Sequence, residues 1–143
     1  MQSHWVRTSM KLYRLVAFSC LSLSVACADQ SPPGPGILTA TLKSPNGAEG
    51  AALVVLMGPG IGEVTPVGSN QLYSNSSLDE VRIVLINQND GTLAFRVEVA
   101  DTTIEPAAIV EEVANPHNQI RSTLDGYQLE FRRGGDAYLT EQQ

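Results

Sequence analysis

The sequence EVRIVLINQNDGTLAFRVEVAD, residues 80–101, carries the clearest structural pattern in the chain. From Leu93 to Val99 every second residue is apolar and the residues between are small or charged, as on a strand with one buried face. Residues 81–86 are apolar except for Arg82, so they predict a central strand that is covered on both faces. The polar segment NQNDG between the two halves tolerates positive φ, and the whole stretch therefore predicts a β-hairpin.

Further strands are expected on both sides of this hairpin. The run 51–57 is apolar throughout, which indicates burial on both faces. Segment 107–114 allows a short helix, but the β-branched residues that recur in it favour a strand. The predicted strands outside the hairpin are 37–43, 51–57, 63–67, 71–74, 107–114 and 127–133.

About seven to eight short strands with turn signals between them predict an all-β fold. The expected architecture is a single antiparallel β-sandwich of jelly-roll or immunoglobulin-like type. No internal disulfide is expected after the signal, so burial of apolar side chains must stabilise the domain. The residues predicted to fill the core are Leu53, Val55, Val81, Ile83, Leu85, Leu93, Phe95, Val97, Leu129 and Phe131.

The N-terminal part of the chain predicts a secretory signal. Residues 1–14 contain basic side chains and no acid, and the apolar run 15–26 follows them. This run is too short to span a bilayer, which takes ~20 apolar residues. The pattern is complete from Met10 onward, so Met10 is the favoured start of the translated chain. The expected division of the chain is a signal in 1–27, a Pro/Gly-rich tether in 28–36, the β-sandwich domain in 37–133 and a tail in 134–143.

Cys27 stands where a lipid anchor is expected. Residues 23–27, LSVAC, resemble a bacterial lipobox, in which the signal is cut before a cysteine that then carries lipid. The sequence Ala26-Cys27-Ala28 also fits an ordinary A-x-A cleavage site, and both interpretations stay open. Cys20 lies inside the signal, so Cys27 has no partner for an internal disulfide and lipidation is favoured. An exported protein, anchored to a membrane of the bacterial cell envelope, is therefore expected.

Acidic residues dominate the chain after the signal. All 15 Asp and Glu follow Cys27, against six of the nine Lys and Arg. Binding to phosphates needs clustered basic side chains, so nucleic acid is not expected as a partner. The pair Arg132-Arg133 is too small a cluster for this and is expected to guard a sheet edge. The expected partners are a membrane lipid through Cys27 and a protein or glycan that the sequence does not identify.

Few residues suggest catalysis. His117 is the one histidine after the signal and lies in a polar loop without a nucleophile motif, so neither a catalytic triad nor a protein-only zinc site is predicted. Glu105, Glu111 and Glu112 offer carboxylates for sugar hydrolysis. Adjacent residues of a strand point to opposite faces, however, so a solvated strand edge is the favoured interpretation.

A weak calcium-binding pattern lies in the turn of the predicted hairpin. Asn87, Asn89 and Asp90 bring side-chain oxygens close together. The same residue types form hairpin turns for conformational reasons alone, and that second interpretation is favoured. No cofactor is expected. The acids considered as further calcium ligands are Asp79, Glu80 and Asp101.

The order of strands and turns resembles that of cohesin-like β-sandwich modules. The resemblance rests on residues 91–97, GTLAFRV, which follow a Gly-x-Leu…Phe-x-Val pattern, and on the Gly/Pro bend at 58–62 after a buried strand. It covers 37–133 and implies protein–protein binding through one sheet face, without identifying a contact residue. The layout is also similar to that of small bacterial lipoproteins.

Together these features predict a non-enzymatic exported lipoprotein. Its β-sandwich is expected to serve as a protein-binding or structural module at the cell envelope. The alternative is a carbohydrate-binding or accessory domain of a polysaccharide-processing system, with Tyr73, Tyr127 and Tyr138 as candidate aromatic platforms.

Overall fold

The computed structural model describes residues 33–89 and 91–133, and these residues form an all-β fold. The predicted signal, Cys27, most of the tether and the C-terminal tail lie outside the described residues. In the described part no helix is long and apolar enough to cross a membrane. The strands are β1 (Gly36–Lys43), β2 (Ala51–Met57), β3 (Ile61–Pro66), β4 (Gln71–Ser77), β5 (Glu80–Ile86), β6 (Ala94–Val99), β7 (Ala107–Ala114) and β8 (Gln128–Arg133).

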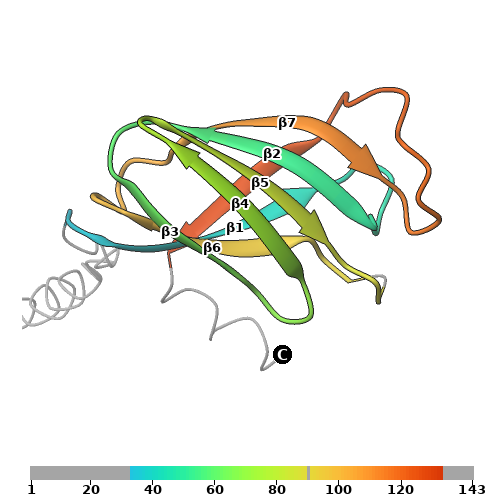
Figure 1. Cartoon of the computed structure of the whole chain (residues 1–143), viewed down its shortest axis with the longest axis horizontal. Coiled ribbons are helices and arrows are strands. Elements are labelled where there is room, and N and C mark those ends of the chain that lie inside the picture. The colour runs from blue at the N-terminus through green and yellow to red at the C-terminus, as the bar shows by residue number, and fades with distance from the viewer. Residues whose placement is uncertain (1–32, 90, 134–143) are drawn as a thin grey trace, which may run out of the picture. The chain divides into compact units, whose positions relative to one another are not determined.

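The strands form two four-stranded antiparallel sheets that pack face to face as a β-sandwich (Figure 1). Sheet A has the order β3-β6-β1-β8, and sheet B has the order β4-β5-β2-β7. The predicted all-β sandwich is therefore confirmed. The prediction of a strand rather than a helix at Ala107–Ala114 is also confirmed, because this segment is β7 and pairs with β2.

The hairpin predicted for residues 80–101 is wrong, although both of its strands exist. β5 pairs with β2 and β4 in sheet B, whereas β6 pairs with β1 and β3 in sheet A. The chain between β5 and β6 therefore crosses from one sheet to the other. Each strand has a buried apolar face, and the crossing lets these two faces pack against each other across the core.

Two asparagines hold this crossing in place. The Asn70 side chain is 8% exposed and donates to the carbonyl oxygens of Val67 at 2.7 Å, Thr92 at 3.1 Å and Ala94 at 3.2 Å. Asn87, which is 5% exposed, donates to the side-chain oxygen of Asn70 at 3.2 Å. These bonds satisfy backbone carbonyl groups near the ends of the strands, where strand pairing stops. They also join the β3–β4 connection to the crossing.

The core lies between the inward faces of the two sheets. Val81, Ile83 and Leu85 of β5 and Phe95 and Val97 of β6 are buried in it, as predicted. Each inward position faces the opposite sheet, so large side chains from both sheets interdigitate. Leu93 is also buried, and Leu129 and Phe131 are partly buried against this cluster.

The core residues predicted for β2, Leu53 and Val55, are not the ones that point into the core. Ala52, Val54 and Leu56 enter the core, whereas Leu53 and Val55 lie on the outer face. Val55 is nevertheless buried, so β2 is covered on both faces near its centre. An apolar run without alternation does not reveal which of its residues point inward.

The predicted two-sided burial of β5 is also wrong. β5 is central because it pairs on both sides, yet its outer residues Arg82 and Val84 are exposed.

Replacing Phe95 by Ala should test the core directly. Phe95 is fully buried, and the substitution removes a ring that fills the space between the sheets, so the free energy of unfolding should fall by about 3–5 kcal/mol. Urea titration followed by circular dichroism measures this value. The control is Ile104→Ala at a 67% exposed position, and an equal loss in the two variants would contradict the assigned core.

Candidate functional site

Four connections gather at one end of the sandwich, which we call the loop end. They are residues 44–50, 67–70, 87–93 and 115–127, and strand register places them together because Ala51 pairs with both Ile86 and Ala114. The chain enters β1 and leaves β8 at the opposite end, as Figure 1 shows.

The carboxylate of Glu49 is the centre of a polar network at the loop end. Its side chain is 1% exposed, and the Arg121 guanidinium donates to it from Nε at 3.1 and 3.2 Å and from Nη2 at 3.0 Å. The hydroxyls of Ser44 and Tyr127 donate to Oε1 at 2.8 and 2.5 Å. Asn46 in turn donates to the Tyr127 hydroxyl at 2.8 Å. The buried charge is thus paired and hydrogen-bonded, as burial requires.

Backbone contacts bring the two loops of this network together. Gly50 donates its N–H to the Ala114 carbonyl at 2.8 Å, and a Cβ at Gly50 would lie 2.6 Å from the Asn115 carbonyl oxygen. Only glycine permits this close approach. The Asn115 side chain accepts the N–H groups of His117 at 2.9 Å and Gln119 at 3.0 Å, which folds the start of the second loop.

The pKa of Glu49 follows from its partners. Burial by itself raises this pKa, but the hydrogen bonds from Tyr127, Arg121 and Ser44 outweigh burial and hold the pKa below its ordinary value of 4.5. Conversely, the hydrogen bond to Glu49 raises the pKa of Arg121. A carboxylate with a lowered pKa is a weak base at neutral pH, so Glu49 is suited to fixing the loops and poorly suited to taking a proton from Ser44.

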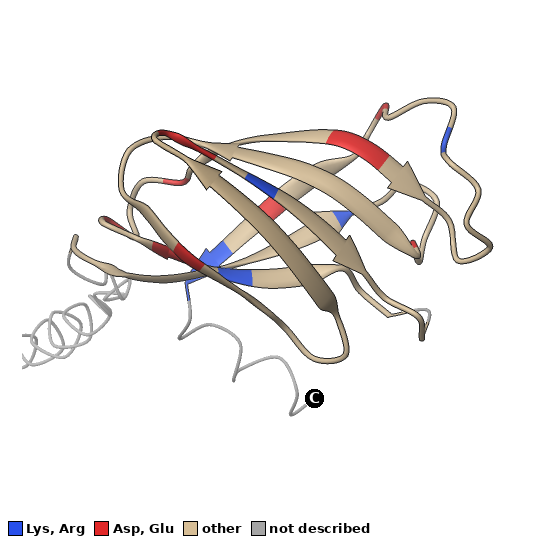
Figure 2. Cartoon of the chain, in the orientation of Figure 1, with Lys and Arg blue, Asp and Glu red and all other residues tan. Residues whose placement is uncertain are grey.

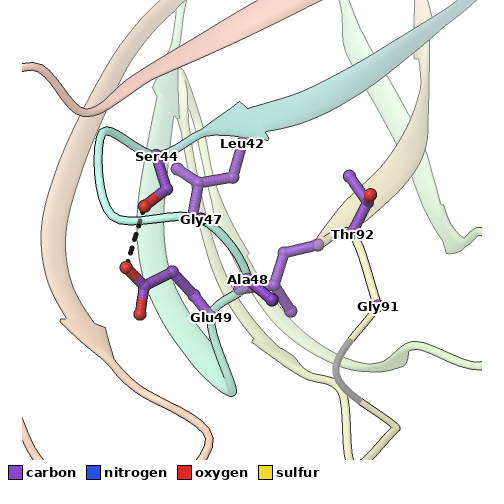
Figure 3. A pocket seen from close by; sticks show the side chains of 8 residues that line it. Leu42, Ser44, Gly47, Ala48, Glu49, Gly91 and Thr92 are labelled. Carbon is purple, nitrogen blue, oxygen red and sulfur yellow. Dashed lines mark hydrogen bonds between the residues drawn. The ribbon is translucent and has the colours of Figure 1, made fainter.

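A hollow of about 160 Å³ lies beside this network (Figure 3). A water molecule occupies roughly 30 Å³ in the liquid, so the hollow has room for a few waters or for one small polar group. Ser44 and Glu49 face each other at its wall, and Gly91 and Thr92 lie on the opposite side. Its lining residues are Leu42, Ser44, Gly47, Ala48, Glu49, Gly91, Thr92 and Leu93.

The turn that suggested calcium is used within the protein. The Asn87 side-chain oxygen accepts the N–H of Asn89 at 2.9 Å, and Asp90 lies outside the described residues. Glu80 and Asp101 cannot complete such a site, because Glu80 begins β5 and Asp101 follows the end of β6, and both lie at the ends of these strands that are far from Asn87. Among the described residues, no group of three or more His, Cys, Asp or Glu is placed to hold a metal ion. A calcium site at Asn87, Asn89 and Asp90 stays a prediction.

The carboxylates considered for sugar hydrolysis lie on or near β7. Register slips between Leu53 and Val54, so Glu111 has no partner on β2 and Glu112 pairs with Leu53. This bulge puts both glutamates on the outer side of sheet B, contrary to the expectation of opposite faces. Glu111 is bound to Arg82 by an ion pair of 2.6 Å, whereas Glu105 lies in the loop before β7.

The histidine and the candidate tyrosines lie apart. His117 is exposed in the 115–127 loop. Tyr127 is half-buried in the Glu49 network, whereas Tyr73 is 62% exposed on β4. Tyr73 is on β4 and Tyr127 directly precedes β8, and these are edge strands of different sheets, so the two tyrosines do not form one aromatic platform. Tyr138 lies outside the described residues.

An apolar stripe crosses the outer face of sheet B. Leu53, Val84 and Tyr73 follow one another in register across β2, β5 and β4. Ile109 and Val55 occupy the neighbouring row. Tyr73, Ile109 and Val84 are 62%, 48% and 38% exposed. Arg82 pairs in register with Val55 and forms ion pairs with Glu80 and Glu111. We call Leu53, Val55, Tyr73, Val84 and Ile109 the outer stripe.

Replacing Glu49 by Gln should destabilise the domain in a pH-dependent way. The loss of charge-assisted hydrogen bonds should cost about 1.5–3 kcal/mol at pH 7. Because folding lowers the pKa of Glu49, its contribution is present above pH 4.5 and is lost as the pH falls through the lower pKa of the folded state. The difference in stability between the wild type and the variant should therefore disappear in acid. Thermal unfolding of both proteins from pH 7 to pH 3 measures this difference. The control Glu63→Gln removes an exposed carboxylate, and a gap of equal size in it would contradict the role of Glu49.

No protein-family model matches the chain, and no match was found among the curated proteins or among the solved structures. The β-sandwich architecture serves many unrelated functions, so the fold by itself assigns none. The function of this chain is therefore inferred from the residues and surfaces of the described domain.

Proposed function

We propose that this chain is a non-enzymatic lipoprotein of the bacterial cell envelope whose β-sandwich binds another protein. The outer stripe is the observation that carries this proposal. It collects three exposed apolar or aromatic side chains on one sheet face, whereas an antiparallel sheet usually exposes polar residues on its solvated side. Such a surface is typical of protein-binding sites.

The composition of the outer stripe supports a protein partner. Tyr73 has a ring with a polar tip, and aromatic residues and arginine are enriched in protein interfaces. Arg82 lies in the same row as Ile109 and Val55, and its ion pair with Glu111 reaches across β2, so apolar and charged side chains are mixed on this face. The presence of an exposed aromatic residue and an arginine on one face supports a protein partner.

The direction of the chain is compatible with an anchor at Cys27. β1 begins at the end of the sandwich opposite the Glu49 network, so the chain from Cys27 enters the domain at the end away from that network. Residues 28–36 span at most about 30 Å when extended. The outer stripe lies on a sheet face rather than at the entry end, and it would stay accessible.

Carbohydrate binding is the second candidate. Tyr73 is exposed, and Gln71 and Asn75 flank it on the same face of β4, so an aromatic ring lies between two amides. A sugar ring stacks on aromatic side chains and takes hydrogen bonds from amides. A glycan array distinguishes the two candidates, because glycan binding lost in Tyr73→Ala would favour a sugar ligand.

Charge placed in the outer stripe should prevent protein binding. Ile109→Glu puts a carboxylate in the stripe, so partners that co-purify with the wild-type chain from its own cells should be lost at least tenfold in the variant. The matched control is Ile120→Glu, in the 115–127 loop at a position 65% exposed. Quantitative mass spectrometry of the two pull-downs measures the difference. Equal retention of all partners by both variants would refute binding through this face.

Replacing Cys27 by Ser should abolish lipid attachment. The lipobox-like sequence puts the modified thiol at this residue, so incorporation of labelled palmitate should fall to background and the protein should leave the membrane fraction. The control Cys20→Ser, inside the predicted signal, should keep the label. A wild-type chain that is cut at the A-x-A site and carries no lipid would contradict the anchor.

A further inference from the structure

The four edge strands of this sandwich differ in how they are protected against pairing with another chain. An edge strand has free backbone N–H and C=O groups, and proteins guard such strands with charge, proline, bulges or covering loops. β3 has Pro66 and a register irregularity between Ile61 and Val64. β8 carries three charged side chains, Glu130, Arg132 and Arg133.

β7 is guarded twice. It contains the bulge at Glu111 and two glutamates. The 115–127 loop also covers its end, because Ala114 bridges to Ile120 and Arg121 donates its N–H to the Val113 carbonyl at 2.8 Å.

β4 has none of these protections. Its sequence QLYSNSS contains no charge and no proline, and all seven residues pair with β5 without a register shift. Every residue of β4 except Leu72 is exposed. Figure 2 shows this strand uncharged along its whole length, while the turn after it is acidic. In the described part of the chain β4 pairs with β5 alone.

We propose that β4 pairs with β4 of a second copy of this chain, antiparallel and about a two-fold axis normal to the sheet, and joins two B sheets into one of eight strands. Antiparallel strands are self-complementary under such an axis, so one surface serves both copies. Pairing about Ser74 would set Gln71 opposite Ser77 and Tyr73 opposite Asn75 of the other copy. These side chains are all uncharged.

Charge favours this pairing over contact elsewhere between copies. The chain has a net charge of −6, so most surfaces of two copies repel each other. Under the two-fold axis the turn that contains Asp79 lies toward the 67–70 connection of the other copy rather than next to itself, and Glu80 belongs to β5 on the other side of β4. Self-pairing of β7 would instead bring glutamates together. β4 is thus the edge at which a second copy approaches without like charges in contact.

The pairing would also extend the outer stripe. Tyr73 lies on the outer face of the edge strand, so the two Tyr73 rings would come close to each other across the axis. The apolar rows of the two copies would then form one continuous surface. The proposal does not depend on what binds that surface, because it concerns the backbone edge of β4.

Cysteine scanning of the full-length chain tests this proposal. Tyr73→Cys, Ser74→Cys and Asn75→Cys are each oxidised and separated on non-reducing gels, with the wild-type chain as reference for its own cysteines. A residue on the axis meets its own copy within the Cα separation of about 4.4–6.8 Å that a disulfide needs, whereas its neighbours do not. One of the three variants should form the dimer at least tenfold faster than the other two. Equal rates in all three, or rates no higher than in the β3 control Thr65→Cys, would overturn the proposal.

A charge at the edge gives an independent measurement. Asn75→Lys puts two ammonium groups near the axis, so sedimentation equilibrium should show a dimer in the wild-type chain and a monomer in the variant. Thr65→Lys makes the same change in charge on β3 and should leave the dimer intact. A wild-type chain that stays monomeric at 100 µM would overturn the proposal, and so would cross-linking of the cysteine variants to another protein instead of to themselves.

Discussion

The structure depends on contact between the inward faces of its two sheets. Each sheet has an apolar side, and neither can bury that side within its own layer. Phe95, Val54 and Ile83 are fully buried where the layers meet. No cysteine lies among the described residues, so no disulfide shares this role in the domain. The connection between β5 and β6 crosses from one sheet to the other. It places these two amphipathic strands on opposite sides of the core, where their apolar faces meet.

Polar groups at the loop end complete the fold without weakening it. Asn70 and Asn87 satisfy carbonyl groups where the ladders stop, and Glu49 is paired and hydrogen-bonded by the loop after β7. In the part of the chain that the structure describes, no buried side-chain polar atom lacks a partner. Networks satisfied to this degree make an end of a sandwich rigid.

Local pattern predicted the strands well but did not predict their neighbours. The bounds of β2 and β7 match the expected ranges, because apolar and β-branched runs end at clear turn signals. The prediction of a hairpin was wrong because alternation shows which face of a strand is buried but does not show which strand lies beside it. The core residues of β2 were predicted wrongly because its apolar run has no alternation.

The Glu49 network could not have been predicted. Its partners Arg121 and Tyr127 lie 72 and 78 residues away in sequence, and no short motif links them. The bulge at Glu111 was equally hidden, since it depends on register with β2.

The position of β1 has a consequence for biosynthesis. The first strand lies between β6 and β8, so sheet A is assembled from both ends of the domain sequence. Pairs so distant in sequence form slowly, because a long loop must close before they gain any stability. A ribosome-bound chain that still lacks β8 leaves one side of β1 without its partner. The sandwich is therefore completed only after translation has passed Arg133, the last residue of β8.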